Sequence, residues 1–245
     1  MKKLIVALLL AVAPVLGLAA GGGIHLDDAD IDVSDQASLQ RGAKYFVNYC
    51  LSCHSAKFQR YNRMARDLGL TEDEVKENLM FTTDKIGDTM QIAMDPANAE
   101  AWFGVTPPDL SLIARSRGVD YIYSYLRGFY VDEKRPFGVN NRVFPDVGMP
   151  HVMWDLQGMQ KAVFKEVDGQ QVIEELVPVD GPAGQGKMST EEFDNAMRDL
   201  TAFLSYVAEP VQLERKRIGT YVLIFLAFFF VIAYLLKKEY WKDIH

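Results

Sequence analysis

The chain has 245 residues, which is enough for one sizeable domain with its own core or for two small ones. Its 49% hydrophobic and 24% charged content is ordinary for a globular protein, so composition excludes only disordered and fibrous classes. The formal net charge of −7 argues against nucleic acid as a partner and favours a cationic one.

The first 20 residues have the layout of a secretory signal peptide. Two lysines follow Met1, an apolar run covers residues 4–18, and small residues at Ala19 and Ala20 offer a cleavage site. An uncleaved anchor fits less well, because the run is short for spanning a bilayer. We therefore predict a signal peptide over residues 1–20 and export of the domain that follows.

The segment after the leader is acidic, with five aspartates between residues 26 and 35, and it predicts an extended arm. Such an arm is either a solvated acidic face or a docking patch for a basic partner. Apolar residues then recur at helical spacing from Ser38 to Cys50, which predicts a helix.

This helix leads into Cys50-Leu51-Ser52-Cys53-His54, the Cys-x-x-Cys-His signature of c-type haem attachment. Two thiols three positions apart can each add across one vinyl group of the same porphyrin, and the adjacent histidine then supplies an axial nitrogen. The motif predicts one haem c, covalently attached through Cys50 and Cys53, with His54 as an iron ligand. Attachment outside the cytoplasm agrees with the export signal.

Three other interpretations of the cysteine pair are weaker. A zinc site needs another ligand pair, but these are the only two cysteines and the remaining histidines are far apart in the sequence. A redox dithiol is expected in a thioredoxin-like βαβ context, which does not follow. Two buried structural cysteines followed by a chance histidine is the third alternative.

Downstream of the motif the pattern favours short helices and loops. The capping box Thr71-Glu72-Asp73-Glu74 predicts a helix that continues to about Met80, and residues 84–104 lack a period and predict an irregular loop. The rigid segment 106–111 leads to a helix ending near Gly118, and Asp120 is predicted to cap the next helix.

Two arginines on this pair of helices, Arg115 and Arg117, are candidates to meet the haem propionates, since a buried ring with two carboxylates needs cationic partners. Residues 136–150 have no period and predict a loop. Alternation over 161–178 around Asp168-Gly169 predicts a surface β-hairpin.

The C-terminal part begins with a second capping box, residues 189–192, before an amphipathic helix that Pro210 closes. A basic linker over 211–217 then precedes the uncharged segment 218–236. At about 1.5 Å per residue, this segment as a helix covers most of a ~30 Å hydrocarbon core. We predict one transmembrane helix there.

Basic residues flank both ends of this segment, so charge alone does not orient it. The export signal places the domain of residues 21–210 outside the cytoplasm and the tail of residues 237–245 inside.

The second axial ligand is expected to be a methionine, because a thioether opposite the histidine raises the potential of an electron carrier. Met149 is favoured, because it lies between Gly148 and Pro150, well downstream of the motif, where the backbone can be fixed against the ring. His151 is the main competitor and would give a lower potential, and Met153 is a weaker one. Less favoured are Met80, Met90, Met94 and Met197.

Taken together, these features resemble the cytochrome c1 family, the haem subunit of the cytochrome bc1 complex, in its bacterial type. The resemblance covers nearly all of the presumed mature chain. It rests on an ordered set of motifs: Arg41-Gly42, Tyr45, Cys50 to Ser55, Tyr61-Asn62-Arg63, Thr71 to Glu74, Pro107 to Ser111, Arg115-Ser116-Arg117, Gly148-Met149-Pro150, Ala208-Glu209-Pro210 and Arg215-Lys216-Arg217.

The resemblance implies a mainly α fold: a class I cytochrome c-like haem domain with loop and β-hairpin insertions, followed by one C-terminal transmembrane helix. It implies His54 and Met149 as the iron ligands. It further implies that Pro108, Arg117 and Tyr121 line the haem, with Arg117 near a propionate.

Two departures limit the transfer from the family. Pro150 follows the ligand methionine at once, whereas many relatives place another residue between them. Trp102-Phe103-Gly104 stands where mitochondrial members have an Asn-rich stretch, so haem contacts there are not carried over.

The resemblance also implies a function and partners. The chain is expected to be the electron-transfer subunit of ubiquinol–cytochrome c reductase, taking an electron from the Rieske iron–sulfur protein and passing it to cytochrome c. Quinol chemistry would belong to cytochrome b, and this chain needs no catalytic side chain of its own. A dimeric complex in the bacterial inner membrane is expected, with the haem domain in the periplasm. The alternatives are a freestanding membrane-tethered cytochrome and a haem enzyme such as a peroxidase.

Overall fold

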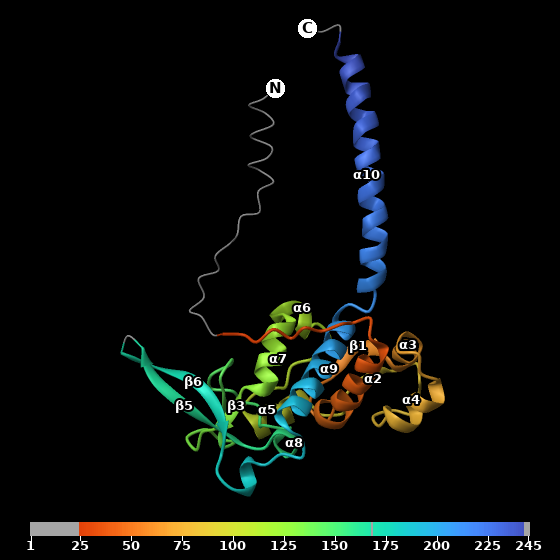
Figure 1. The fold of residues 1–245 in the computed structure, drawn as a ribbon. Helices are drawn as coiled ribbons and strands as arrows, with labels where there is room; N and C mark the ends of the chain where they lie inside the picture. The colour runs from red at the N-terminus through yellow and green to blue at the C-terminus, as the bar shows by residue number, and fades with distance from the viewer. Residues whose placement is uncertain (1–24, 168, 243–245) are drawn as a thin grey trace.

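The computed structural model describes residues 25–167 and 169–242, so the signal peptide expected over residues 1–20 lies outside the described residues. A head of short helices and small sheets is joined to one long helix that projects away from it (Figure 1). In chain order the elements are α2 (Gln36–Tyr45), the π-helical turn η1 (Phe46–Cys50), β1 (Ala56–Arg60), α3 (Tyr61–Asp67), α4 (Glu72–Asn78), β2 (Thr89–Met90), α5 (Pro96–Phe103), α6 (Ile113–Arg117), α7 (Val119–Arg127), β3 (Phe129–Val131), β4 (Val139–Asn141), α8 (Trp154–Gln157), β5 (Gln160–Val167), β6 (Gln170–Pro178), the 3₁₀ turn η2 (Pro182–Gly184), α9 (Thr190–Ala208) and α10 (Gln212–Tyr240).

Helix α9 is the centre of the head, and it contacts α2, α6, α7, α8 and β1. The helix begins at the predicted capping box, in which Ser189 and Glu192 bond each other's backbone N–H groups. Its apolar side chains are buried along the predicted face, and the buried set includes Phe193, Met197, Leu200, Phe203, Leu204 and Val207. The predicted amphipathic helix is confirmed.

Helices α2 and α9 pack at close range because Gly42 presents no side chain to its neighbour. A Cβ placed on Gly42 would lie 2.1 Å from the backbone oxygen of Asp199. One turn further on, the rings of Phe46 and Phe203 pack with their centroids 5.6 Å apart. The predicted helix from Ser38 to Cys50 is therefore present, except that its last turn is π-helical.

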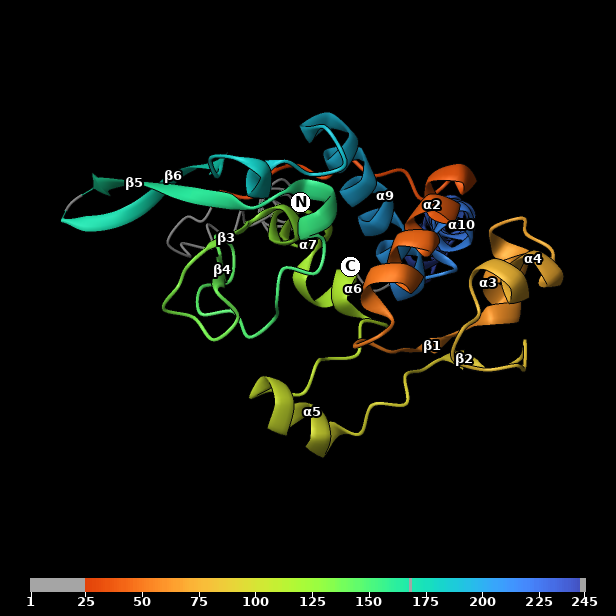
Figure 2. The same cartoon turned by 90° about the horizontal axis from the view of Figure 1, so that it is seen from below.

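The described residues form three two-stranded antiparallel sheets. The predicted hairpin over 161–178 is confirmed as β5 and β6, which pair from Gln160 with Pro178 to Val167 with Gln170. Figure 2 shows this hairpin extending sideways from the head.

Two loop predictions were wrong in part. Strand β4 lies within 136–150 and pairs with β3 in the register Phe129 with Asn141. The stretch 84–104 contains β2 and helix α5, which begins at the N-cap Asp95 and ends at Gly104 in the left-handed conformation with φ 73°.

The predicted capping role of Asp120 was also wrong. The N-cap of α7 is Gly118, and Asp120 lies in the first turn of the helix. Its carboxylate accepts a hydrogen bond of 3.0 Å from the backbone N–H of Ala29 in the N-terminal arm, so the side chain has a tertiary partner.

The N-terminal arm has neither helix nor strand over residues 25–34, as predicted for an extended segment. It lies against the head, where Ala29 is buried and Asp27 forms ion pairs of 2.9 Å with Arg127 and Arg142. Asp35 accepts hydrogen bonds from the first N–H groups of α2. Part of the acidic character therefore serves the fold, and docking of a basic partner stays a prediction.

Helix α10 spans Gln212–Tyr240, so residues expected as a linker belong to the same helix as the apolar segment 218–236. It is the one helix among the described residues that is long and apolar enough to cross a membrane. Its apolar side chains are exposed. The helix itself projects away from the head (Figure 1). This arrangement is that of a membrane anchor.

Candidate haem site

The attachment motif forms a tight turn at the end of η1. The backbone N–H groups of Cys53 and His54 both donate to the carbonyl oxygen of Cys50, at 3.0 and 2.8 Å. Both thiols are free; Cys50 is buried and Cys53 is half-buried. Burial raises the pKa of the Cys50 thiol to about 12. The turn thus carries two neighbouring thiols and the histidine on one short segment.

His54 is oriented by a backbone atom. Its Nδ1 lies 2.7 Å from the carbonyl oxygen of Pro108. A carbonyl oxygen only accepts, so Nδ1 carries the proton and the lone pair is on Nε2. Burial lowers the pKa of His54, which favours this neutral form. A histidine held in this way is prepared to bind a metal through Nε2.

The loop that provides this carbonyl is itself anchored beside the motif. The carboxylate of Asp109 accepts from the backbone N–H groups of Lys57 and Ser111, at 3.0 and 2.9 Å. The N–H of Leu110 donates to the carbonyl of Ser55 at 2.8 Å. Pro108 is therefore positioned by bonds to the segment that directly follows the motif.

A small cavity of about 250 Å³ lies next to Cys53. Its lining combines the motif with α5 and the double-proline loop: Cys53, Ser55, Lys57, Ile92, Met94, Pro96, Ala99, Thr106, Pro107 and Asp109. Sequence reasoning treated α5 as loop and did not place it here. The Asp95-Pro96 start and Gly104 end were the local signals that could have found the helix.

Met149 is half-buried against a small apolar cluster formed by Phe129, Val139 and Val147. This cluster is distinct from the main core, which contains the buried side chains of α2 and α9. The hydroxyl of Tyr125 donates to its sulfur, with 3.3 Å between Oη and Sδ. The preceding Gly148 faces the loop before the double proline, because a Cβ placed there would lie 3.0 Å from Val105 Cγ1. The loop of Met149 therefore packs against the chain that leads to the carbonyl bonded to His54.

Of the competing ligands, Met94 lines the cavity beside Cys53, whereas the others lie in the apolar core or, for His151, against Phe129. His151 is buried with its ring stacked on Phe129, 4.9 Å between centroids and 4° between planes, and burial lowers its pKa to about 4. Its Nε2 has no hydrogen-bond partner among the described residues. Met153 is buried in the main core. The main core also buries Met80, Met90 and Met197.

The other predicted haem-lining residues lie in a row that leads to Met149. The guanidinium of Arg117 lies 5.5 Å from the ring centroid of Tyr121. The Tyr121 ring stacks on Tyr125 at 6.2 Å and 11°, and Tyr125 contacts Met149. Arg117 and Arg115 are both exposed. The structure thus brings Arg117 and Tyr121 to the Met149 side and Pro108 to the His54 side.

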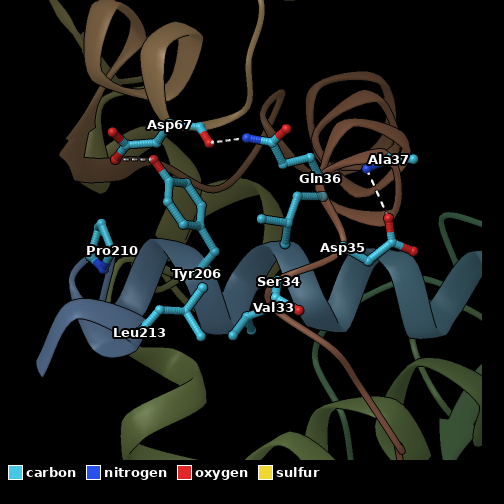
Figure 3. Close-up of a pocket in the computed structure, with 10 residues that line it drawn as sticks. Val33, Ser34, Asp35, Gln36, Ala37, Asp67, Tyr206, Pro210 and Leu213 are labelled. Carbon is cyan, nitrogen blue, oxygen red and sulfur yellow. Dashed lines mark hydrogen bonds between the residues drawn. The ribbon is translucent and has the colours of Figure 1, made fainter. Parts of the chain in front are cut away.

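The structure contains a second cavity, of about 420 Å³, where the arm meets α2, α9 and the start of α10 (Figure 3). Tyr206 lies in it, with its hydroxyl donating to Asp67 at 3.0 Å. None of the two cysteines, His54 or Met149 lines it. This cavity therefore belongs to the junction with the anchor rather than to the haem site.

The site fits a c-type haem on the chemistry of its donors. Two free thiols adjoin a histidine whose Nε2 is available, and a thioether is fixed on a separate loop. Among residues 25–167 and 169–242, no group of three His, Cys, Asp or Glu side chains is arranged to hold a metal ion. The site and α10, the one candidate membrane-spanning helix among the described residues, are the features of the class of membrane-anchored c-type cytochromes.

Comparison with known proteins gives the family. A family model described as "Cytochrome C1 family" matches residues 28–244, so this chain belongs to the cytochrome c1 family. This family supplies the haem subunit of ubiquinol–cytochrome c reductase, and the predicted family is confirmed.

Relatives match over the full length of the chain. Cytochrome c1 of Allochromatium vinosum is 54% identical, with 100% of each chain covered. A protein of Nitrosomonas europaea named "Ammonia monooxygenase gamma subunit" is 46% identical, covering 100% of this chain and 98% of its own. A solved chain of a hyperthermophilic respiratory Complex III is 17% identical with a TM-score of 0.45, covering 100% of this chain and 98% of its own.

Proposed function

We propose that this chain is the membrane-anchored electron-transfer subunit of a bacterial ubiquinol–cytochrome c reductase. It would take an electron from the Rieske iron–sulfur protein and pass it to a cytochrome c. The observation that carries this proposal is the contact between His54 Nδ1 and the Pro108 carbonyl oxygen. His54 directly follows Cys53 in the chain, and the thiols of Cys50 and Cys53 are both free. Membership of the cytochrome c1 family supports it.

The proposal also includes the haem ligands. Cys50 and Cys53 would attach one haem c, with His54 Nε2 and Met149 Sδ as axial ligands. Such a haem supplies one-electron chemistry between ferric and ferrous iron. The protein's part is to fix both ligands, and Arg117, exposed beside Tyr121, would pair with a propionate.

The subunit would have no quinone site and no catalytic side chain, so it acts in an oxidoreductase only as part of the complex. Cytochrome b would carry out the quinol chemistry, in a dimeric assembly. The net charge of −7 suits a basic cytochrome c as acceptor.

The domain limits of the proposal are a signal peptide over 1–20, a periplasmic haem domain over 21–210 and a basic linker over 211–217. A single span over 218–236 would cross the bacterial inner membrane, leaving the tail 237–245 in the cytoplasm. The exposed apolar surface of α10 supports the anchor.

Two other candidates remain to be separated by experiment. One is a freestanding membrane-tethered cytochrome without a fixed complex. The other is a subunit of an ammonia monooxygenase, which the name of the 46% identical relative brings in.

The decisive experiment is purification of the full chain from native membranes in mild detergent through a C-terminal tag, followed by a reduced-minus-oxidised spectrum. The proposal expects a c-type band together with b-type haem and an iron–sulfur protein. A c-type band alone would favour the freestanding membrane-tethered cytochrome. Copurification of monooxygenase subunits would favour the ammonia monooxygenase subunit. A Cys50→Ser/Cys53→Ser variant should lose covalent haem, and a wild-type protein without a c-type band would overturn the proposal.

The axial ligand is tested separately with volume-matched variants. Met149→Leu should abolish the near-infrared sulfur-to-iron charge-transfer band of the oxidised protein, whereas Met153→Leu should keep it. Retention of the band in Met149→Leu would exclude Met149 as the ligand.

A further inference from the structure

Tyr125 is the side chain that contacts the sulfur of Met149. Its Oη lies 3.3 Å from Sδ, within hydrogen-bonding reach of a sulfur acceptor. Methionine cannot donate, so the phenol is the donor. Neither the attachment motif nor the family resemblance assigned Tyr125 a role.

The hydroxyl is held in place by contacts on several sides of the ring. Tyr121 stacks on one face at 6.2 Å, and Phe129 meets the ring edge-on at 5.3 Å. The backbone carbonyl of Tyr125 accepts from the side-chain amide of Asn141 at 2.8 Å, which ties the end of α7 to β4. Tyr125 contacts both the main core and the cluster around Met149. It is therefore a rigid donor rather than a mobile surface group.

A thioether sulfur has two lone pairs, so it can bind a metal with one and accept a hydrogen bond with the other. A donor fixed on one side selects which lone pair is left for the iron and so orients the methyl group. It also withdraws electron density from the sulfur. Ferric iron depends more on ligand donation than ferrous iron, so the hydrogen bond favours the reduced state.

We propose that Tyr125 is a positioning residue that orients Met149 and raises the midpoint potential of the bound haem through the Oη–Sδ hydrogen bond. This inference rests on the proposed function, because it requires Met149 as the axial ligand. Tyr125 would thus raise the midpoint potential without itself binding the iron.

The test uses the full-length protein in detergent with its haem attached. Tyr125→Phe removes only the hydroxyl and keeps the ring that packs between Tyr121 and Phe129. Tyr123→Phe is the matched control, because Tyr123 is a buried tyrosine of the same helix whose ring lies against Arg127 and Arg198, at 4.6 and 5.6 Å from their guanidinium carbons. Potentiometric titration and the near-infrared band of the oxidised form are measured for each.

Loss of one hydrogen bond to a weak acceptor should change the one-electron reduction equilibrium by about two- to fivefold toward the oxidised form. The midpoint potential of Tyr125→Phe should fall, and its sulfur-to-iron band should persist at a shifted wavelength. Tyr123→Phe should match the wild type in both.

The outcomes separate this inference from the proposed function. The role of Tyr125 would be overturned if the midpoint potential of Tyr125→Phe were unchanged or raised. If Met149→Leu still abolished the sulfur-to-iron band, Met149 would stand as the axial ligand. A wild-type protein without the band, or a band that survives Met149→Leu, would refute the ligation, and the inference would fall with it.

Discussion

The imidazole of His54 is oriented by the carbonyl oxygen of Pro108, 2.7 Å from Nδ1 and 54 positions further along the chain. The acceptor is a backbone atom, so a side-chain replacement at position 108 does not remove it. What can be changed is the anchoring of its loop, which depends on the two hydrogen bonds that Asp109 accepts from Lys57 and Ser111. The carboxylate of Asp109 therefore controls the orientation of His54 through the position of the Pro108 loop.

Asp109→Ala should raise the midpoint potential. A less firmly held carbonyl accepts a weaker bond from Nδ1, the imidazole becomes a poorer electron donor, and the ferric state loses stability. We expect a rise of roughly 20–60 mV, the one-electron equivalent of about 0.5–1.4 kcal/mol. Potentiometric titration measures it.

Removal of a negative charge near the haem would also raise the potential, so Asp109→Asn is the control. It removes the same charge but keeps one acceptor oxygen for the loop. The anchoring effect is the difference between the two variants, and equal potentials would show that only the charge matters.

Gly42→Ala should destabilise the head, because α2 and α9 are too close at this point for a side chain. The added Cβ would lie 2.1 Å from the Asp199 carbonyl oxygen and 2.7 Å from Phe203 Cβ. The helices must move apart, at a cost of about 1–3 kcal/mol or more. Thermal or denaturant unfolding of the purified protein measures the loss. Gly87→Ala, where an added Cβ meets nothing within 4 Å, should unfold like the wild type.

Asp199→Asn should also weaken the joint between α2 and α9. The buried carboxylate accepts from Arg41 at 2.6 and 2.9 Å and from the Ser38 hydroxyl at 2.6 Å. An amide leaves the arginine with a poorer partner, and we expect a loss of about 1–3 kcal/mol in unfolding free energy. Asp180→Asn is the contrast, since Asp180 is 95% exposed in its pair with Lys161 and should have no measurable effect. Equal losses of unfolding free energy in Asp199→Asn and Asp180→Asn would contradict the stabilising role of the buried Asp199 carboxylate.

The features that sequence reasoning predicted well depend on local signals. The capping boxes at Thr71 and Ser189 lie where expected, because both partners are three residues apart in the chain. The hairpin β5–β6 follows from alternation around a short turn. The attachment motif is a property of five consecutive residues.

The features that were missed depend on contacts between distant segments or on elements too short to show a period. Strand β4 has three residues and exists through its pairing with β3. Asp120 has the residue type of a cap, yet its carboxylate bonds the N-terminal arm. His54 donates to the Pro108 carbonyl and Tyr125 donates to Met149 across separations of 54 and 24 positions in the chain, and no local pattern marks these bonds.

The two capping boxes predict a pH-dependent part of the stability. Hydrogen bonds from Thr71 lower the pKa of Glu74 below its ordinary 4.5, and those from Ser189 lower that of Glu192. A carboxyl whose pKa is depressed by folding adds stability that is complete above its unfolded pKa and is lost as the pH falls through its folded pKa. In the double variant Glu74→Gln/Glu192→Gln the amide side chains still cap the helices but do not titrate. The wild type should therefore have the larger free energy of unfolding at pH 7. This difference should vanish when the pH falls below the depressed pKa values of the two glutamates. Thermal unfolding between pH 7 and pH 3 measures this, and a stability difference that is constant over that range would contradict it.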